Sequence, residues 1–501
     1  MDGEKVFQPR DEGKTSQDIE QEAWDTDNKV PFEQDSNIVD WDGPTDPLNP
    51  MEWAMSKKVT MIGIVSFLTF LTPLASSIFA PAAEEVLADF GSNSIYMESF
   101  IVSAYLLGNC FGPLVIAPWS ELYGRSPVYH CCNVLFVLFN VACARAPNLG
   151  ALLVFRILSG LAGGCPLTLG AGTIADLVRA EKRGGAMVSW VMGPLLGPVV
   201  GPIGSVGGYL SQAKGWRWCA WFLVIMSGFA TVLTFLFLKE TYAPIILEQK
   251  TQRLRKQMDN PHLRSKLQKD QMAKDLFKRS IVRPIRMLAL SPIVFLLSLH
   301  ISIIFGYIYL VLTTLSEVFE DTYGWSQGNV GLSYIGIGVG FLLGLFFTGV
   351  ISDRLVDHLT AKASQGERKP EYRLPPMVIG SICVPIGLFL YGWTADTKQQ
   401  WILPIIGTAF LAIGMVISLM TCTTYLVDAY PVYAASATAA STVFRSLVGA
   451  LLPLAGNPMY AALGLGWGTS LLAFIALVMV PVPLFFYRYG EKIRKATKAE
   501  F

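Results

Sequence analysis

The chain has 501 residues, of which 52% are hydrophobic and 15% are charged, and its mean hydropathy is +0.44. The formal net charge is +1, and the charged residues are concentrated between long apolar runs. This composition excludes a soluble globular protein and indicates an integral membrane protein.

The first 57 residues are polar and acidic, and no positively charged start is followed by a short apolar core and a cleavage site. We therefore expect no cleavable signal peptide. Residues 1–57 are predicted to form a disordered cytoplasmic tail, in which 41–53 is a short element that leads into the first membrane span.

Twelve segments reach the length of about 18 to 25 apolar residues that is needed to cross the hydrocarbon core. The first six lie near 58–80, 97–117, 128–144, 151–175, 186–210 and 219–238. The second six lie near 292–315, 330–351, 377–394, 401–427, 434–460 and 468–488. The chain thus divides into two helical halves, 58–238 and 292–488, with a basic loop over 239–291 and a short tail over 489–501.

A charged pattern recurs after the second and the eighth spans. In both places a small residue ends the span, an acid follows four residues later, and a basic residue follows on a short loop. The first copy is Ala117, Glu121 and Arg125, with Gly124 before the arginine, and the second is Gly349, Asp353 and Arg354. A carboxylate at that depth can pair with a cation or cap a neighbouring helix. Ordinary loop charge explains either copy alone, but recurrence in two six-span halves favours a conformational gate.

Within the fourth span lies Arg156, which should face a cavity or the carbonyl groups of a neighbouring helix, because a charged side chain is costly in lipid. An imidazole ordinarily titrates near neutral pH, so His300 in the seventh span is either a packing residue or a proton or substrate ligand. Arg445 in the eleventh span is a weaker candidate for an anion or substrate contact. Many aromatic side chains lie in the spans, whereas a dense set of polar side chains that would suit a sugar is missing, which favours an apolar ligand.

The fifth span contains three Gly-Pro steps in register. Its residues of interest are Gly193, Pro194, Gly197, Pro198, Gly201, Pro202, Gly207 and Gly208. A spacing of four places the first three glycines on one stripe of a helix, where another helix can approach closely. The prolines weaken that helix locally, and the bilayer keeps it helical but kinked. This combination predicts a moving helix interface, with a merely structural glycine face as the alternative.

The basic residues set the expected orientation. The central loop, the loop near 362–373 and the end of the chain are rich in Lys and Arg, whereas the turns after spans one and seven carry acids and no cation. Both termini and the central loop should therefore be cytoplasmic. The central loop also contains several acids, which favours a topological anchor over binding to nucleic acid or to an anionic membrane. The eight cysteines lie in or beside apolar runs without zinc-ligand spacing, so no disulfide framework, metal or cofactor is expected.

These features resemble the major facilitator superfamily, from about residue 49 to the C-terminus. The loop after span two is similar to its Gly-x-x-x-Asp-Arg-x-Gly-Arg motif, with Glu121 at the acid position and Gly124 and Arg125 retained, and the second copy fits Gly349, Asp353 and Arg354. The resemblance implies an all-α fold of twelve transmembrane helices, in two pseudo-symmetric six-helix bundles around a central cavity.

Within that superfamily the nearest resemblance is to fungal twelve-span drug/proton antiporters. It rests on the Gly193 to Gly208 run, on Arg156 with Gly160 and Gly164, and on the phrases at 239–244, 370–374 and 425–431. It implies export of drugs, toxins or secondary metabolites in exchange for protons by alternating access, and it assigns proton handling to Arg156. No Asp or Glu lies near the middle of a predicted span, so the proton carrier is unassigned.

Three functions remain open at this stage. Efflux across the plasma membrane leads, with the vacuolar membrane as an alternative, and the partners are a small molecule, protons and the bilayer. Proton-coupled uptake of a nutrient shares the fold, and a membrane-embedded sensor or enzyme shares only the hydrophobicity. We find no intramembrane His/Asp/Glu cluster or phosphate-binding Gly-Lys motif, so catalysis is not expected. Oligomeric state is left open.

Overall fold

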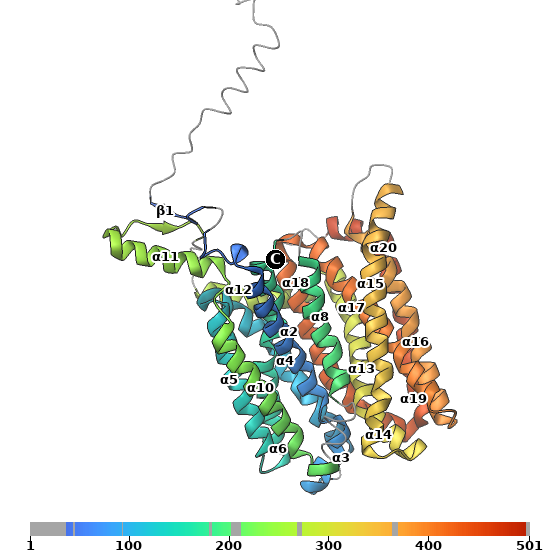
Figure 1. The fold of residues 1–501 in the computed structure, drawn as a ribbon. Coiled ribbons are helices and arrows are strands. Elements are labelled where there is room, and N and C mark those ends of the chain that lie inside the picture. Colours follow the sequence, from blue (N-terminus) through green and yellow to red (C-terminus); the bar gives the residue numbers. More distant parts are fainter. Residues whose placement is uncertain are drawn as a thin grey trace, which may run out of the picture.

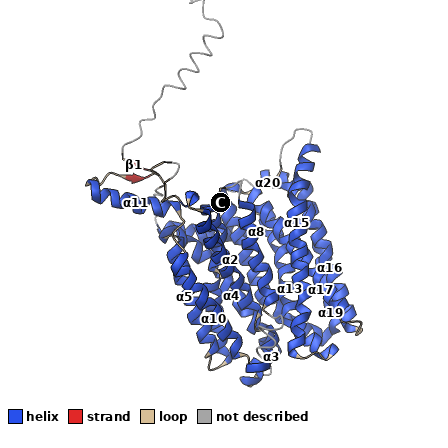
Figure 2. Ribbon diagram, viewed as in Figure 1, coloured by secondary structure: helices blue, strands red, loops and turns tan. Residues whose placement is uncertain are grey.

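The computed structural model describes residues 37–43, 46–92, 94–179, 183–201, 212–267, 273–362 and 369–496, and they are almost entirely helical (Figure 2). The elements of the first half are β1 (Ile38–Val39), η1 (Pro50–Glu52), α2 (Met55–Ser77), η2 (Ala80–Ala82), α3 (Ala83–Asp89), α4 (Ile95–Tyr123), α5 (Arg125–Ala144), α6 (Leu149–Gly163), α7 (Cys165–Leu177), α8 (Arg183–Val200) and α10 (Arg217–Phe237). The central loop contains α11 (Ala243–Met258), β2 (Arg264–Ser265) and α12 (Ala273–Leu290). The second half contains α13 (Pro292–Tyr323), α14 (Gln327–Val330), η4 (Gly331–Tyr334), α15 (Ile335–Lys362), η5 (Pro370–Arg373), α16 (Pro375–Asp396), α17 (Ile402–Ala429), η6 (Pro431–Tyr433), α18 (Ala434–Leu451), η7 (Leu452–Ala455), α19 (Gly456–Met479) and α20 (Pro481–Ala496).

The helices form twelve membrane spans, as the sequence predicts. In the described residues ten helical segments are long and apolar enough to cross a bilayer, and α8 adds a shorter apolar helix. The last of the ten, Ala434–Lys495, has 62 residues. It reverses at Gly464, whose φ of 77° is not helical, and the ring of Tyr460 lies beside Gly468 across the turn. Because one span needs only about 20 residues, this segment contains spans eleven and twelve.

The fourth and fifth spans contain prolines. The fourth is one apolar segment, Leu149–Leu177, as predicted, and it divides into α6 and α7 at Gly164, with Pro166 at the start of α7. Proline lacks the backbone donor that would continue the first helix, but the φ and ψ of Gly164 remain in the helical region, so the span continues. The fifth was predicted to extend to residue 210; the described helix α8 continues through Pro194 and Pro198 and ends at Val200, and residues 202–211 lie outside the described part.

The two halves repeat one packing pattern. In the first half α2 packs on α8, α4 on α6, α5 on α6 and α5 on α10; in the second, α13 packs on α18, α15 on α17, α16 on α17 and α16 on α19. These are the same pairs of spans, shifted by six. The halves meet along α4 with α18 and along α8 with α15, which is again a symmetric pair of contacts (Figure 1). The fold is therefore two pseudo-symmetric bundles, joined along four helices.

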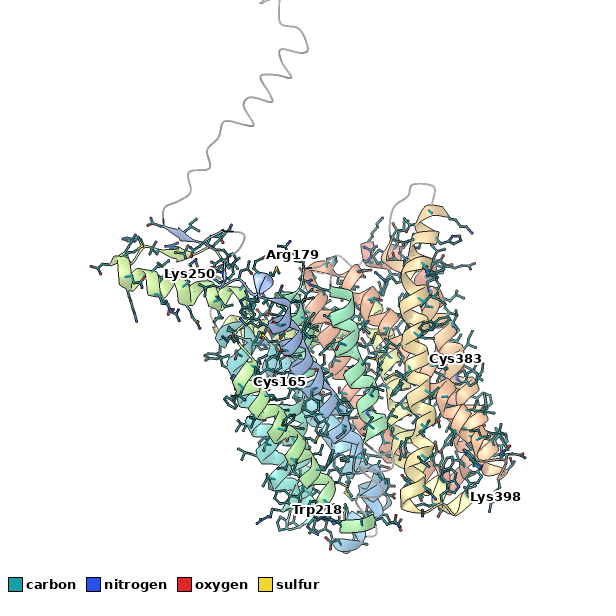
Figure 3. The ribbon with its side chains drawn as sticks, viewed as in Figure 1. Cys165, Arg179, Trp218, Lys250, Cys383 and Lys398 are labelled. Carbon is teal, nitrogen blue, oxygen red and sulfur yellow. The ribbon has the colours of Figure 1, made fainter. Side chains whose placement is uncertain are left out.

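The central loop and the segment before the first span carry structure that the sequence did not indicate. Strand β1 pairs in parallel with β2, so that Ile38 lies opposite Arg264 and Val39 opposite Ser265. Figure 1 shows α11 projecting sideways from this end of the bundle, beneath β1. Strands of two residues are too short to give a hydrophobic pattern in the sequence. Residues 1–36 of the predicted disordered tail lie outside the described part. Lys250 and Arg179 lie at this end of the molecule, and Trp218 and Lys398 at the other (Figure 3).

Candidate functional site

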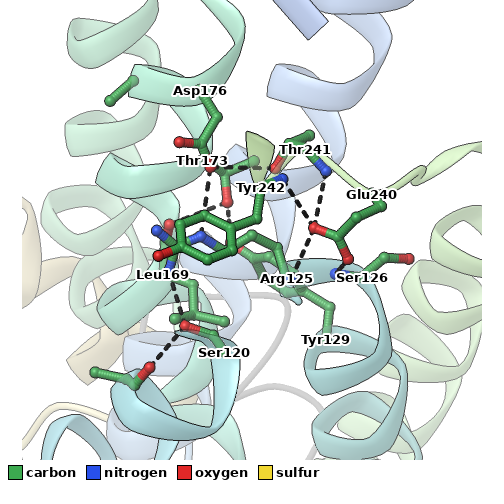
Figure 4. A network of polar contacts seen from close by, with 12 residues as sticks. Ser120, Arg125, Ser126, Tyr129, Leu169, Thr173, Asp176, Glu240, Thr241 and Tyr242 are labelled. Carbon is green, nitrogen blue, oxygen red and sulfur yellow. Dashed lines mark hydrogen bonds and ion pairs between the residues drawn. The ribbon is translucent and has the colours of Figure 1, made fainter. Parts of the chain in front are cut away.

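A carboxylate from the end of the sixth span caps the start of the third (Figure 4). Glu240 accepts hydrogen bonds from the backbone N–H groups of Arg125 at 2.9 Å and Ser126 at 3.1 Å. It also accepts from the N–H groups of Thr241 at 3.0 Å and Tyr242 at 2.9 Å. The first N–H groups of a helix lack intrahelical partners and carry partial positive charge, so this acid stabilises the N-terminus of α5.

Arg125 joins three further segments at the same point. Its Nη1 donates to Ser120 Oγ on α4 at 2.7 Å, its Nε donates to Asp176 on α7 at 3.4 Å, and its guanidinium lies 4.9 Å from the centre of the Tyr242 ring. The preceding Gly124 has a φ of 97°, and a Cβ there would overlap the carboxylate of Glu240. Glycine at this motif position therefore permits both the turn and the cap.

Of the predicted first copy of the gate, Gly124 and Arg125 lie in this network, whereas Glu121 is exposed on the last turn of α4. The residues that sequence reasoning missed are Asp176 and Glu240. Both occur in the chain as ordinary acids at the ends of spans, and their distance from Arg125 along the sequence, 51 and 115 residues, hides the contact.

The second half contains a related network that involves other residues than Gly349, Asp353 and Arg354. Arg373, just before the ninth span, donates to Asp428 at the end of the tenth at 2.5 Å, as Arg125 at the start of the third span reaches Asp176 at the end of the fourth. Arg494 and Glu371 form an ion pair at 3.3 Å, and Lys369 and Glu491 one at 2.6 Å.

The predicted second copy lies elsewhere on α15. No atom lies within 4 Å of the position of a Cβ on Gly349, and Arg354 is exposed; the side chain of Asp353 is outside the described part. Arg373 and Asp428, which form the ion pair that corresponds to Arg125 and Asp176, lie in the sequence phrases at 370–374 and 425–431.

The glycine stripe of α8 packs directly on the backbone of α2. A Cβ on Gly193 would lie 2.9 Å from Phe70 N, and one on Gly197 would lie 2.8 Å from Phe70 O and 2.9 Å from Leu74 N. A Cβ on Gly201 would lie 2.6 Å from Ser77 Oγ. These contacts leave no room for a side chain, as the four-residue spacing predicts. Pro202, Gly207 and Gly208 of the same motif lie outside the described residues.

Arg156 holds the same turn of α2 from the other side. Arg156 is 2% exposed, and its guanidinium donates to the carbonyl oxygens of Ala75 at 3.4 Å and Ser76 at 3.0 Å, and to Val102 O on α4 at 3.2 Å. Carbonyl groups in the last turn of a helix lack their usual partners and carry partial negative charge, so they attract a cation. The ring of Phe79 lies 4.5 Å from the guanidinium.

Three polar contacts join the two halves in the described residues. Ser76 Oγ donates to Tyr309 Oη on α13 at 3.2 Å, and Cys110 Sγ to Val443 O on α18 at 3.3 Å. Nearer the other end, Asn457 Nδ2 donates to Glu98 on α4 at 3.1 Å. The last turn of α2 thus contacts the glycine stripe, Arg156 and the opposite half together.

The remaining two candidates differ in position. His300 is 1% exposed and hydrogen-bonds to Ser381 Oγ at 3.0 Å within the second bundle, as a packing residue would. Arg445 lies with its guanidinium 4.9 Å from the centre of the Phe305 ring, and that ring lies 4.9 Å from the ring of Tyr309. Arg445 is therefore close to the contact between the halves, and His300 is not.

Residues 65–453 match the sequence profile of the Major Facilitator Superfamily. The chain belongs to this superfamily. It is 56% identical to MFS-type transporter penM of Penicillium rubens over 93% of this chain and 91% of that one, and 49% identical to efflux pump radE of Floropilus chiversii over 92% and 86%. Among solved structures, a D-xylose-proton symporter superposes with a TM-score of 0.64 at 18% identity, covering 87% of this chain and 98% of that one.

Membership confirms the predicted family and the twelve-helix fold. In this superfamily member the sites described above have distinct positions: the Arg125 and Arg373 networks lie within single bundles at one end, and the turn held by Arg156 lies where the bundles meet. In the described residues no three His, Cys, Asp or Glu side chains are arranged to hold a metal ion.

Proposed function

We propose that the protein is a secondary active exporter that carries a small amphipathic or apolar compound out of the cell in exchange for protons, by alternating access. The observation that carries this proposal is the last turn of α2. The glycine stripe of α8, the guanidinium of Arg156 and Tyr309 of the opposite half all contact it. A shift of this turn would therefore change contacts within the first bundle and contacts at the interface between the bundles.

Export, rather than uptake, is supported by the glycine-proline helix and by the relatives. The helix resembles the antiporter motif in its fifth-span position, and one close relative is named an efflux pump. The solved symporter is too distant in sequence to support anything beyond the fold. Uptake is the alternative that the experiment below separates.

We place the protein in the plasma membrane with both termini cytoplasmic. The proposed parts are a cytoplasmic tail (1–57), a first bundle (58–238), a cytoplasmic loop (239–291), a second bundle (292–488) and a cytoplasmic end (489–501). The basic loop with Lys250 and the exposed Arg179 lie at one end of the molecule, in support of a cytoplasmic face there (Figure 3).

We assign the residues as follows. Gly124 and Arg125, with Glu121 beside them, hold the cytoplasmic ends of the first bundle in place; Arg373 takes this role in the second bundle, in preference to Gly349, Asp353 and Arg354. Arg156 couples proton or substrate movement to the position of α2. Arg445 is a secondary candidate at the interface, and the position of His300 argues for packing.

The test is the accumulation of a panel of dyes, azoles and fungal metabolites in yeast that lacks its own pumps and expresses this chain. We expect lower accumulation of at least one compound, reversed by a protonophore. Gly197→Leu should abolish the effect, and Gly228→Leu should not, because no atom lies within 4 Å of a Cβ at Gly228. Higher accumulation would support uptake instead, and no change with surface expression verified would contradict export of these classes.

A further inference from the structure

Helix α12 lies at the junction of the two halves, beside the start of a membrane span. It ends at Leu290, and α13 begins two residues later at Pro292. It packs on α4 of the first half and on α18 and α13 of the second (Figure 1). Since the next span starts at once, α12 must lie at the depth of the membrane surface.

One face of α12 packs on the protein. Met287 is fully buried in a cluster with Ile293 and Val294 of α13, and Pro284 is also buried. The guanidinium of Arg283 lies 4.9 Å from the centre of the Tyr433 ring, just before α18. These residues fix which sides of the helix remain free.

The free side is apolar along one edge. Ile281 is 38% exposed, Val282 48% and Ile285 57%, and spacings of three and four residues place them on one helical face. Exposed branched side chains in a row are unfavourable in water. On a helix that leads directly into a span, they suit the boundary between lipid headgroups and acyl chains.

The neighbouring edge is basic. Lys278, Arg279 and Arg286 are exposed. At 100° per residue Arg279 and Arg286 lie about 20° apart, next to Val282, whereas Lys278 lies between Ile285 and Val282 at the start of the apolar edge, where its long side chain can extend to the headgroups. In the described part of the chain no ion pair is found for any of the three. An apolar edge bordered by exposed cations is the pattern of a helix that lies on an anionic membrane surface.

We propose that α12 is an interfacial helix that binds the anionic headgroups of cytoplasmic-leaflet lipids through Lys278, Arg279 and Arg286, while Ile281, Val282 and Ile285 enter the acyl boundary. Because α12 touches a span of each half, a lipid held there contacts the junction that alternating access must open. The proposal rests on the cytoplasmic orientation given above, and it does not depend on the transported compound or on the direction of transport.

The binding test uses the purified full-length protein, reconstituted in mixed phosphatidylcholine and phosphatidylserine and analysed by native mass spectrometry. Lys278→Gln/Arg279→Gln should lower the ratio of retained phosphatidylserine to phosphatidylcholine by about tenfold, given the attraction of each cation near an anionic surface. The matched control is Arg253→Gln/Lys256→Gln, which removes two exposed cations from α11. An unchanged ratio in the α12 variant, or an equal fall in both, would overturn the proposal.

A second measurement tests the depth of α12 independently of headgroup charge. A fluorophore on Val282→Cys, with Cys131 and Cys383 replaced by Ser, should be quenched by brominated acyl chains and protected from an aqueous quencher. The same fluorophore on Lys256→Cys of α11 should show the reverse. Aqueous quenching at position 282 equal to that at 256 would show that the apolar edge lies in water. Neither result bears on export, so the two proposals can fail separately.

Discussion

At the scale of single residues, Arg156 shows how this fold accommodates a buried charge. Removing a guanidinium from water is costly, and here three carbonyl oxygens on two helices offset that cost. Two acceptors belong to the last turn of α2 and one to α4: Nη2 donates to both helices, and Nη1 adds a second bond to α2. Lysine offers a single compact charge in place of the planar guanidinium fork.

Arg156→Lys should therefore reduce transport strongly although the charge is kept. We expect efflux of a compound that the wild type exports to fall by about tenfold or more, because the single nitrogen of an ammonium group cannot replace both Nη1, which donates to Ala75 O, and Nη2, which donates to Ser76 O and Val102 O. The measurement is the initial efflux rate, normalised to protein at the cell surface. Arg145→Lys, at an exposed position, should behave as wild type; near-normal efflux by Arg156→Lys would contradict the bracing role.

Glu240 is the second residue whose role depends on its partners. Glu240→Gln replaces one carboxylate oxygen with an amide donor, which faces backbone N–H groups that are donors themselves. We expect a loss of about 1–2 kcal/mol of stability from the weakened cap. The readout is thermal unfolding of the purified protein in detergent. Asp357→Asn, at an exposed position on α15, should leave the transition unchanged, and equal shifts in both variants would argue against capping.

The sequence indicated Arg125 and Gly124 as gate residues, but it did not assign Glu240, Asp176 or Asp428 to the contacts that they make. The difference is physical. A turn motif is local, so its residues are recognisable from spacing, whereas an acid becomes a cap or an ion-pair partner only when folding brings a distant helix end beside it. The ion pair of Arg373 with Asp428 was not predicted for the same reason, and the second copy at Gly349, Asp353 and Arg354 stays a prediction.

At the scale of elements, the last turn of α2, which ends the first span, packs between α8, through its glycine stripe, and α6, through Arg156. The spacing of Gly193, Gly197 and Gly201 predicted a close helix approach, because a helix face without side chains allows the backbone of another helix to come near. It could not name α2 as the partner, since spacing describes one surface only. The change from α6 to α7 at Gly164 was likewise not predicted, because the apolar run continues through it without a change in pattern.

Gly197→Ala should be more harmful than its size suggests. The added methyl group would meet the backbone O of Phe70 at 2.8 Å and the backbone N of Leu74 at 2.9 Å, and backbone cannot rotate away as a side chain can. We expect a loss of about 1–3 kcal/mol of stability from overpacking, together with reduced efflux. Thermal unfolding and the cellular efflux assay measure the two effects. Gly228→Ala is the control, and equal behaviour of the two alanine variants would refute close packing as the function of the stripe.

At the scale of the whole molecule, the sequence sufficed for the two bundles of six spans, because apolar length is a strong signal. It did not indicate that the segment before the first span is tied to the central loop. Lys250 of α11 pairs with Asp42 at 2.7 Å and with Asp46 at 3.3 Å, and Lys266 pairs with Asp40. The segment and the loop are about 200 residues apart in sequence, so no local sequence pattern could have predicted that they pair.

This docking should be insensitive to pH over the physiological range. Burial alone would raise the pKa of Asp46, but N–H groups of Asp42 and Leu48 and the ammonium of Lys250 lower it below its ordinary 3.8. The stabilisation is thus present above pH 3.8 and lost only as pH falls through the lower value. Burial would lower the pKa of Lys250, but its two aspartates raise it above 10.5, so the Lys250 contribution is lost only above that value.

Protection of residues 37–46 from a protease that works over a wide pH range should therefore be the same from about pH 5 to about pH 9. Lys250→Gln should speed cleavage of this segment several-fold at every pH, because Lys250 is the cation that holds Asp42 and Asp46 together. Lys256→Gln, an exposed change on the same helix, should not. Wild-type cleavage that rises between pH 7 and pH 5 would show that a group other than these aspartates and Lys250 controls the docking.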